Sequence, residues 1–157
     1  MNIETCRIRA AAADDAESLI PMMRALAVFE GYDDRFAVNA QDLVVRGLGK
    51  GSRSEFHAMV AEIEGIGLAG YVVFMVVPFT YDLRPTLVLK ELYVDGRYRR
   101  WGLGRRLFEA VRGYAAGVEA GRIRWLVLPS NVPAKRLYAA CGGRPDTAWE
   151  TWECTLS

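Results

Sequence analysis

The feature that most constrains this fold is a strand that runs through a glycine turn directly into an amphipathic helix. Residues 86–94 are mostly apolar and β-branched, which predicts a buried strand. After Gly102 the apolar residues, among them Leu103, Leu107 and Tyr114, repeat at helical spacing, and the charged residues lie off that face. The helix therefore begins close to the end of the strand, with the turn between them.

The turn has the pattern Arg99-x-x-Gly102-x-Gly104. Free backbone N–H groups at a helix N terminus, together with the helix dipole, suit a pyrophosphate group. Glycines also allow the backbone to approach a ligand closely. The glycine pair alone does not distinguish this function from a tight connection that binds nothing, because short glycine motifs match many loops.

Two common nucleotide-binding motifs do not fit this turn. A dinucleotide-binding fingerprint requires a third glycine where this chain has Leu107, and it belongs on an early strand–helix–strand unit. A Walker A loop requires a Gly-Lys-Ser/Thr sequence, which does not follow here. A nucleotide-dependent oxidoreductase is therefore disfavoured.

The rest of the pattern predicts a mixed α/β domain around one sheet. A first helix is expected to be capped by Asp14 with Glu17, and Pro21 should kink it or delay its start. A second, short helix is expected after Asn39. The expected strands cover residues 6–10, 56–63, 68–77, 86–94, 123–128 and 149–156, and the later helices begin at residues 103 and 132.

Length and charge narrow the class of protein further. The 157 residues suit a single domain, 1–157, and the net charge of +1 favours neither nucleic acid nor a membrane surface as a partner. The three cysteines have no metal-ligand spacing, so no metal site is expected. The N terminus does not resemble a secretory signal, and we expect a cytoplasmic protein with reduced thiols.

The turn, preceded by Leu92-Tyr93-Val94, resembles the acetyl-CoA signature of the GNAT superfamily of N-acetyltransferases. A second segment, Asn131-x-x-Ala134-x-x-Leu137-Tyr138, resembles the later strand–helix segment of that superfamily. The resemblance covers nearly the whole chain. It implies a mostly antiparallel mixed sheet with about four helices, and fourth and fifth strands that splay apart. Arg100 stands where the family often has glycine, so a positive φ there is costly.

The resemblance also implies a mechanism with acetyl-CoA as co-substrate. The Leu92 N–H would polarise the thioester carbonyl, and Tyr138 would protonate the departing thiolate. The implied cofactor-binding residues are Leu92, Tyr93, Val94, Arg99, Arg100, Trp101, Gly102, Leu103, Gly104, Arg105, Asn131 and Tyr138. By pattern alone, Tyr138 is more often a core aromatic residue than an acid, Asn131 can simply cap its helix and Arg105 can be a solvated side chain.

The acceptor amine must lose a proton before it attacks, so its site requires carboxylates. Glu91 interrupts an apolar strand next to Leu92 and is a candidate catalytic residue as well as a substrate ligand. The other substrate-binding candidates are Glu30, Asp82 and Glu150. For each acid the alternative is an ordinary surface charge.

A narrower resemblance favours a diamine or polyamine acceptor. The segments at 26–30, 79–82 and 89–94 resemble the spermidine/spermine branch of the superfamily, which implies that Glu30, Asp82 and Glu91 line an amine channel. Lys90 opposes a long polycation unless it points to the other face of its strand. Another acceptor (an amino acid, an aminoglycoside or a protein amine) and a non-catalytic acyl-CoA-binding domain remain alternatives. The branch also implies a homodimer, with residues 149–156 as a candidate contact.

Overall fold

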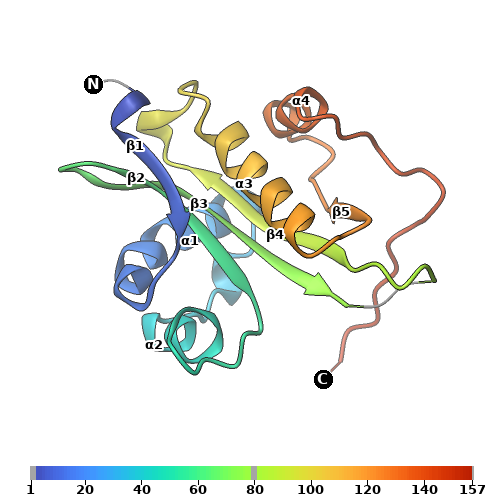
Figure 1. Ribbon diagram of the computed structural model, residues 1–157, viewed down its shortest axis with the longest axis horizontal. Coiled ribbons are helices and arrows are strands. Elements are labelled where there is room, and N and C mark those ends of the chain that lie inside the picture. Colours follow the sequence, from blue (N-terminus) through green and yellow to red (C-terminus); the bar gives the residue numbers. More distant parts are fainter. Residues whose placement is uncertain (1–2, 79–80, 157) are drawn as a thin grey trace.

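The computed structural model describes residues 3–78 and 81–156, and its centre is one five-stranded sheet (Figure 1). The first four strands pair antiparallel in chain order, and the fifth runs parallel to the fourth. The strands are β1 (Cys6–Ala10), β2 (His57–Ile63), β3 (Gly67–Val77), β4 (Thr86–Val94) and β5 (Arg122–Trp125). This confirms the predicted mixed, mostly antiparallel sheet.

Helices cover both faces of the sheet. On one face lie α1 (Ala16–Glu30) and α2 (Ala40–Leu43), and α2 continues into a π-helical turn, Val44–Leu48. On the other face lie α3 (Leu103–Gly117) and α4 (Val132–Ala140). Short 3-10 turns cover Ile3–Thr5, Ala13–Asp15, Asp33–Arg35 and Gly96–Tyr98. No helix in the described part of the chain is both long and apolar enough to cross a bilayer.

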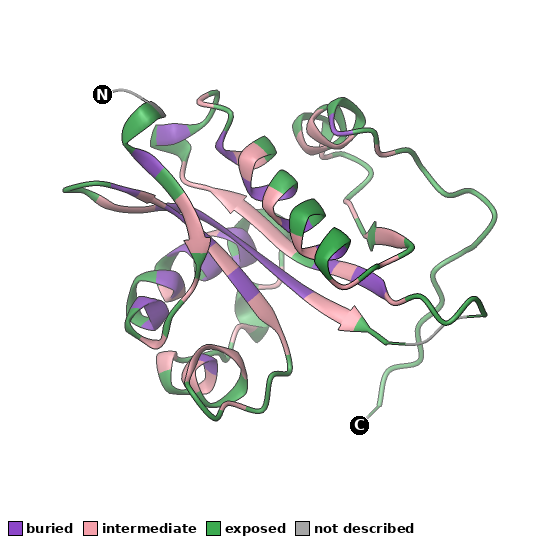
Figure 2. Ribbon diagram, in the orientation of Figure 1, coloured by how far each residue is buried: buried purple, intermediate pink, exposed green. Residues whose placement is uncertain are grey.

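Apolar packing on the two faces makes two clusters with the sheet between them. Leu19 and Tyr71 are fully buried in the cluster beneath α1 and α2. Phe74 and Leu107 are fully buried in the cluster beneath α3. Because both faces are covered, β3 is buried along most of its length (Figure 2).

Strands β4 and β5 splay apart as predicted. Their parallel pairing runs from Thr86 opposite Arg122 to Leu89 opposite Trp125. Strand β5 ends there, whereas β4 continues to Val94. Residues 90–94 therefore have no strand partner on the β5 side.

The predicted C-terminal strand over residues 149–156 is wrong. These residues form no strand, and Trp149 and Trp152 are 73% and 87% exposed. The segment runs along the outside of the molecule away from the sheet (Figures 1 and 2). Strand-like composition makes a strand only where a partner strand offers backbone hydrogen bonds, and this segment meets none. The strand predicted for 123–128 likewise ends early, at Trp125.

The predicted start of the first helix is also wrong in detail. In the loop before α1, the carboxylate that binds the backbone is that of Asp15 rather than that of Asp14. The Asp15 Oδ2 accepts a hydrogen bond from the Ala12 N–H at 2.7 Å. Arg9 donates two further bonds to the same carboxylate, at 2.7 and 2.9 Å. Pro21 lies inside α1, which begins at Ala16, so the helix does not start late.

Replacing Asp15 with asparagine is expected to lower the free energy of unfolding by about 1–3 kcal/mol, because the Arg9 guanidinium loses one of its two anionic partners and keeps only Glu62. Arg9 lowers the pKa of Asp15 below its ordinary value of 3.8. The stabilisation is therefore complete above that ordinary value and is lost as the pH falls through the lower folded value. Urea unfolding at pH 7 and pH 3 checks this, since a loss of equal size at both values contradicts the role of the ion pair.

Candidate active site

The loop between β4 and α3 has two residues in the left-handed region. Arg100 has φ of 69° and Gly102 has φ of 73°. The positive φ predicted to be costly at Arg100 is therefore present. At the start of α3, the Arg106 N–H donates a hydrogen bond to the Gly102 carbonyl at 3.1 Å. The amides of residues 103–105 thus lie in the first turn, where a helix leaves its N–H groups for other acceptors.

Side chains of the loop hold it against the rest of the fold. The Arg99 Nε donates to the Val94 carbonyl at 3.1 Å, and Trp101 packs edge-on against Tyr98 at 5.5 Å. Leu103 is buried in the core. A Cβ at Gly104 would lie 3.0 Å from Leu137 on α4, so glycine permits this close contact of two helices. These side chains brace the loop, and the first-turn N–H groups of α3 are the groups there that suit an anion.

Tyr138 lies beside the opening between β4 and β5. Its ring is 4.8 Å from that of Trp125, the last residue of β5, and 6.2 Å from that of Phe108. Burial, followed by the charge of Glu30, raises the pKa of Tyr138 to about 12. The phenol therefore stays protonated at neutral pH and can donate a proton.

Glu91 lies on β4, on the face covered by α1. Its Oε1 accepts a hydrogen bond from the Tyr71 hydroxyl at 2.8 Å. Burial is the largest cause of its raised pKa, and the charge of Glu30 raises it further. The pairing with β3 passes from Glu91 opposite Val73 to Leu89 opposite Phe74, so Lys90 is the extra residue of a bulge. Lys90 is exposed whereas Glu91 is partly buried, and the Lys90 charge lowers the pKa of Glu91.

The second acid of this region is Glu30, the last residue of α1. Partial burial of the carboxylate raises the pKa of Glu30. Its charge is one of the causes that raise the pKa values of Tyr32, Tyr71, Glu91 and Tyr138. Glu30, Tyr32, Tyr71, Glu91 and Tyr138 are called the acid–tyrosine cluster below. Across residues 3–78 and 81–156, no Lys or Arg forms an ion pair with either acid of the cluster.

The other predicted acids lie elsewhere. Asp82 is exposed in the β3–β4 loop, where its Oδ1 accepts from the Arg84 N–H at 3.1 Å. Asp82 precedes the first residue of β4, whereas Glu91 lies near the last residue of that strand. Glu150 accepts from the Trp152 Nε1 at 3.0 Å in the exposed C-terminal segment. The motif residues 79–80 lie outside the described residues. Asn131 caps α4, its Oδ1 accepting from the Ala134 N–H at 3.2 Å.

Sequence reasoning missed two members of the cluster, Tyr32 and Tyr71. Tyr71 stands twenty positions before Glu91, and only the antiparallel register of β3 and β4 brings them together. A tyrosine within the otherwise apolar run 68–77 was the available signal, because a buried hydroxyl needs a polar partner.

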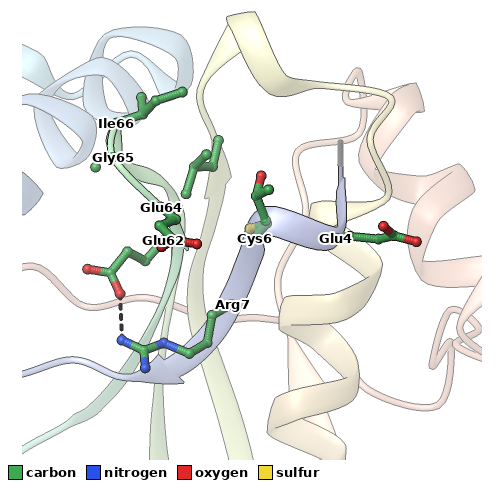
Figure 3. A pocket seen from close by; sticks show the side chains of 10 residues that line it. Glu4, Cys6, Arg7, Glu62, Glu64, Gly65 and Ile66 are labelled. Carbon is green, nitrogen blue, oxygen red and sulfur yellow. Dashed lines mark hydrogen bonds and ion pairs between the residues drawn. The ribbon is translucent and has the colours of Figure 1, made fainter. Parts of the chain in front are cut away.

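Two hollows flank the sheet. One, of about 370 Å³, has Glu91 in its wall and lies between the sheet and the α1–α2 layer. The other, of about 680 Å³, lies at the β1–β2 end and is lined by Glu4, Arg7, Glu62 and Glu64 among others (Figure 3). Arg7 and Glu62 form an ion pair there at 2.8 Å, and none of the predicted site residues lines this second hollow.

A sheet splayed at its last pair of strands, a loop with first-turn N–H groups at the start of α3 and a protonated phenol on α4 together suit acyl transfer. Residues 22–142 match the Acetyltransferase (GNAT) family, and the chain belongs to this family of N-acetyltransferases. The family predicted from the turn and from the Asn131–Tyr138 segment is thereby confirmed.

Relatives and solved structures agree with this assignment. A thialysine N-epsilon-acetyltransferase from Sus scrofa is 30% identical over 152 residues, which are 92% of this chain and 88% of that protein. A spermidine/spermine N(1)-acetyltransferase-like protein from Homo sapiens is 25% identical over 93% of this chain and 21% of its own length. The crystal structure of a probable acetyltransferase superposes with a TM-score of 0.80 at 21% identity, covering 96% of this chain and 98% of that one.

Proposed function

We propose that residues 1–157 form one domain that transfers the acetyl group of acetyl-CoA to a small molecule with a primary amine at the end of a flexible chain. Diamines, polyamines and thialysine, the substrate in the name of the Sus scrofa relative, share this feature. The observation that carries the proposal is that Glu91, bonded to Tyr71, and Tyr138, packed on Trp125, both lie where the pairing of β4 with β5 stops.

The donor side of the site suits acetyl-CoA. The backbone of residues 92 and 93 has no β5 partner and would pair with the pantetheine arm, whereas the Val94 carbonyl already accepts from Arg99. The amides of residues 99–104 would hold the pyrophosphate, with Arg105 exposed beside them and Asn131 at the start of α4. The Leu92 N–H is the proposed donor to the thioester oxygen as negative charge develops there.

The acceptor side suits an amine. Glu30 and Glu91 have no ion-pair partner among the described residues, so the positive charge of an incoming ammonium group would offset the repulsion between the two acids. The raised pKa of Glu91 makes it a better proton acceptor than an ordinary carboxylate, directly or through water.

The steps then balance in a ternary complex. The ammonium loses a proton to Glu91, and the neutral nitrogen attacks the thioester carbonyl carbon to form a new C–N bond. The C–S bond breaks, and the Tyr138 hydroxyl gives its proton to the thiolate sulfur. The attacking nitrogen is cationic after the C–N bond forms and loses its second proton, which returns to Tyr138 through solvent. Glu91 releases the first proton to solvent, so both residues are restored.

Thiol release from acetyl-CoA in the presence of a panel of amines tests this function. We expect turnover with primary amines carried on flexible chains and none with tertiary amines, which cannot form a stable amide. Tight acetyl-CoA binding without turnover on any amine would contradict the proposal and leave a non-catalytic acyl-CoA-binding domain in its place.

We also propose that the protein is a cytoplasmic homodimer in which the second copy covers the exposed C-terminal segment. Trp149, Trp152 and Leu156 are each more than 70% exposed, which is costly for three large apolar residues close together. Cys6, Cys141 and Cys154 are all free, as suits a reducing compartment.

Removing residues 149–157 is expected to convert a dimer into a monomer, because the shared apolar surface is lost. Light scattering should give twice the chain's 17.5 kDa for the full chain and the single mass for the truncated one. A full chain that is monomeric at micromolar concentration would contradict the proposed dimer, whatever its activity.

A further inference from the structure

Strand β3 places one hydroxyl group in a part of the core that is otherwise apolar. Tyr71 is fully buried in the cluster beneath α1 and α2. Every other buried residue of that cluster, in the part of the chain that the structure describes, has an apolar side chain. Phenylalanine would fill the same space without a polar atom to satisfy, because a buried hydroxyl needs a hydrogen-bond partner. The hydroxyl therefore serves a purpose other than packing.

The partner of this hydroxyl is the proposed proton acceptor, since the phenol donates to the Glu91 Oε1 at 2.8 Å. The register of β3 and β4 makes this contact possible. Val73 lies opposite Glu91, and Tyr71 is two positions before Val73. Side chains two positions apart on a strand share a face, so Tyr71 and Glu91 meet diagonally across the two strands. The bulge at Lys90, next to Glu91, is a place where a strand can redirect a side chain.

One oxygen of the Glu91 carboxylate is held in this way and the other is not. Across residues 3–78 and 81–156, the Tyr71 hydroxyl is the hydrogen-bond donor to Glu91, and Oε2 accepts from no protein group. Both oxygens of an ionised carboxylate can accept. Glu91 also forms part of the wall of the 370 Å³ cavity. The core thus holds Oε1, and Oε2 is left for an ammonium group.

We propose that Tyr71 is a positioning residue for the acetyl transfer, which holds Glu91 by one oxygen so that the other can accept a proton from the amine. This rests on the proposed function and adds a residue that acts through Glu91 without touching the substrate. Burial, followed by the charge of Glu91, raises the pKa of Tyr71, so its hydroxyl remains a donor. Burial is the largest influence on the pKa of Glu91 and raises it, whereas the Tyr71 hydrogen bond lowers it and so favours the ionised form that accepts a proton.

Other titratable groups act on Glu91 or line the same cavity. They are Glu30 on α1, Tyr32 after that helix, Lys90 on β4, Asp42 on α2 and Arg46 on the π-helical turn. The charge of Glu30 raises the pKa of Glu91, and the charge of Lys90 lowers it. Tyr71→Phe keeps all of these groups, so a change in the titration of Glu91 in this variant reports the lost hydroxyl.

The pH dependence of kcat/KM in Tyr71→Phe tests the positioning role, with the best acceptor among lysine, spermidine and cadaverine. The acidic limb of this profile follows the ionisation of Glu91 if that residue is the proton acceptor. In Tyr71→Phe the limb should move to higher pH by about one unit, because the carboxylate loses a hydrogen bond that favours its charge. At pH 7, kcat/KM should fall by about tenfold.

Two further variants separate positioning from a general effect on the core. Glu91→Gln is a background without an ionisable carboxyl, so adding Tyr71→Phe there should change the residual kcat/KM by less than about twofold. Tyr114→Phe makes the same chemical change at a ring packed against the opposite face of β3. We expect it to leave the acidic limb where it is in the wild type.

An acidic limb that stays in place in Tyr71→Phe overturns the positioning role while the acetyltransferase reaction stands. A loss of the same size in the wild-type and Glu91→Gln backgrounds does so too. If none of the three amines is acetylated, the proposed function fails, and carbon-13 NMR titration of the Glu91 carboxyl decides the contact by itself. A midpoint raised by about one unit in Tyr71→Phe then supports the role of Tyr71, and an unchanged midpoint overturns it.

Discussion

Replacing Tyr138 with phenylalanine is expected to lower kcat by about 10²- to 10⁴-fold, the usual contribution of a general acid. The phenylalanine ring keeps the contacts with Trp125 and Phe108, and only the hydroxyl that would protonate the thiolate is lost. The dissociation constant for acetyl-CoA should change little. Steady-state kinetics and calorimetry on the same preparation measure the two quantities.

The control for this variant is Tyr114→Phe. It removes a hydroxyl from a ring on α3 that packs against Phe74 of β3. We expect it to retain turnover. Because the pKa of Tyr138 is raised to about 12, its hydroxyl stays protonated between pH 8 and pH 10. We therefore expect no loss of wild-type kcat in this range from ionisation of Tyr138. Undiminished turnover in Tyr138→Phe would remove Tyr138 from the proton-donor role.

Replacing Glu91 with glutamine is expected to have two opposite effects, a loss of activity and a gain in stability. kcat/KM should fall by about 10²-fold, since glutamine neither holds a cation nor accepts a proton. The glutamine oxygen can still accept the Tyr71 hydroxyl, so the hydrogen bond survives. What disappears is a partly buried charge close to that of Glu30.

The sign of the stability change follows from the raised pKa of Glu91, whose ordinary value is 4.5. Between that value and the higher folded value the native state binds more protons than the unfolded state, so its stability falls as the pH rises. Glu91→Gln should therefore unfold at a higher urea concentration than the wild type at pH 7, and the advantage should vanish below pH 4. Glu64→Gln, at an exposed site in the β2–β3 turn, is the matched control.

A variant that loses activity without gaining stability at pH 7 would contradict this account. It would mean that the charge of Glu91 does not destabilise the folded protein. Loss of activity together with a gain in stability is common where an active site holds a charge away from water.

Prediction from sequence succeeded where the signal is local. The bounds of β4 and α4 match the predicted ranges, because the periodicity of apolar residues and a Pro near the start of α4 act within a few residues. The splay of β4 and β5 was predicted through the family resemblance, since no local pattern states where two strands stop pairing. The C-terminal strand failed for the same reason, because its composition says nothing about a partner.

By itself the sequence determined the order of the elements, the anion-binding loop at Arg99–Gly104 and the position of Tyr138 on a helix near that loop. Only the tertiary structure decided which acids act together. The bulge at Lys90 and the β3–β4 register bring Glu91 to Tyr71, the end of α1 adds Glu30, and Asp82 and Glu150 lie elsewhere. Helical and strand periods depend on neighbouring residues, whereas the meeting of distant charges depends on strand register and helix packing, which the whole core fixes at once.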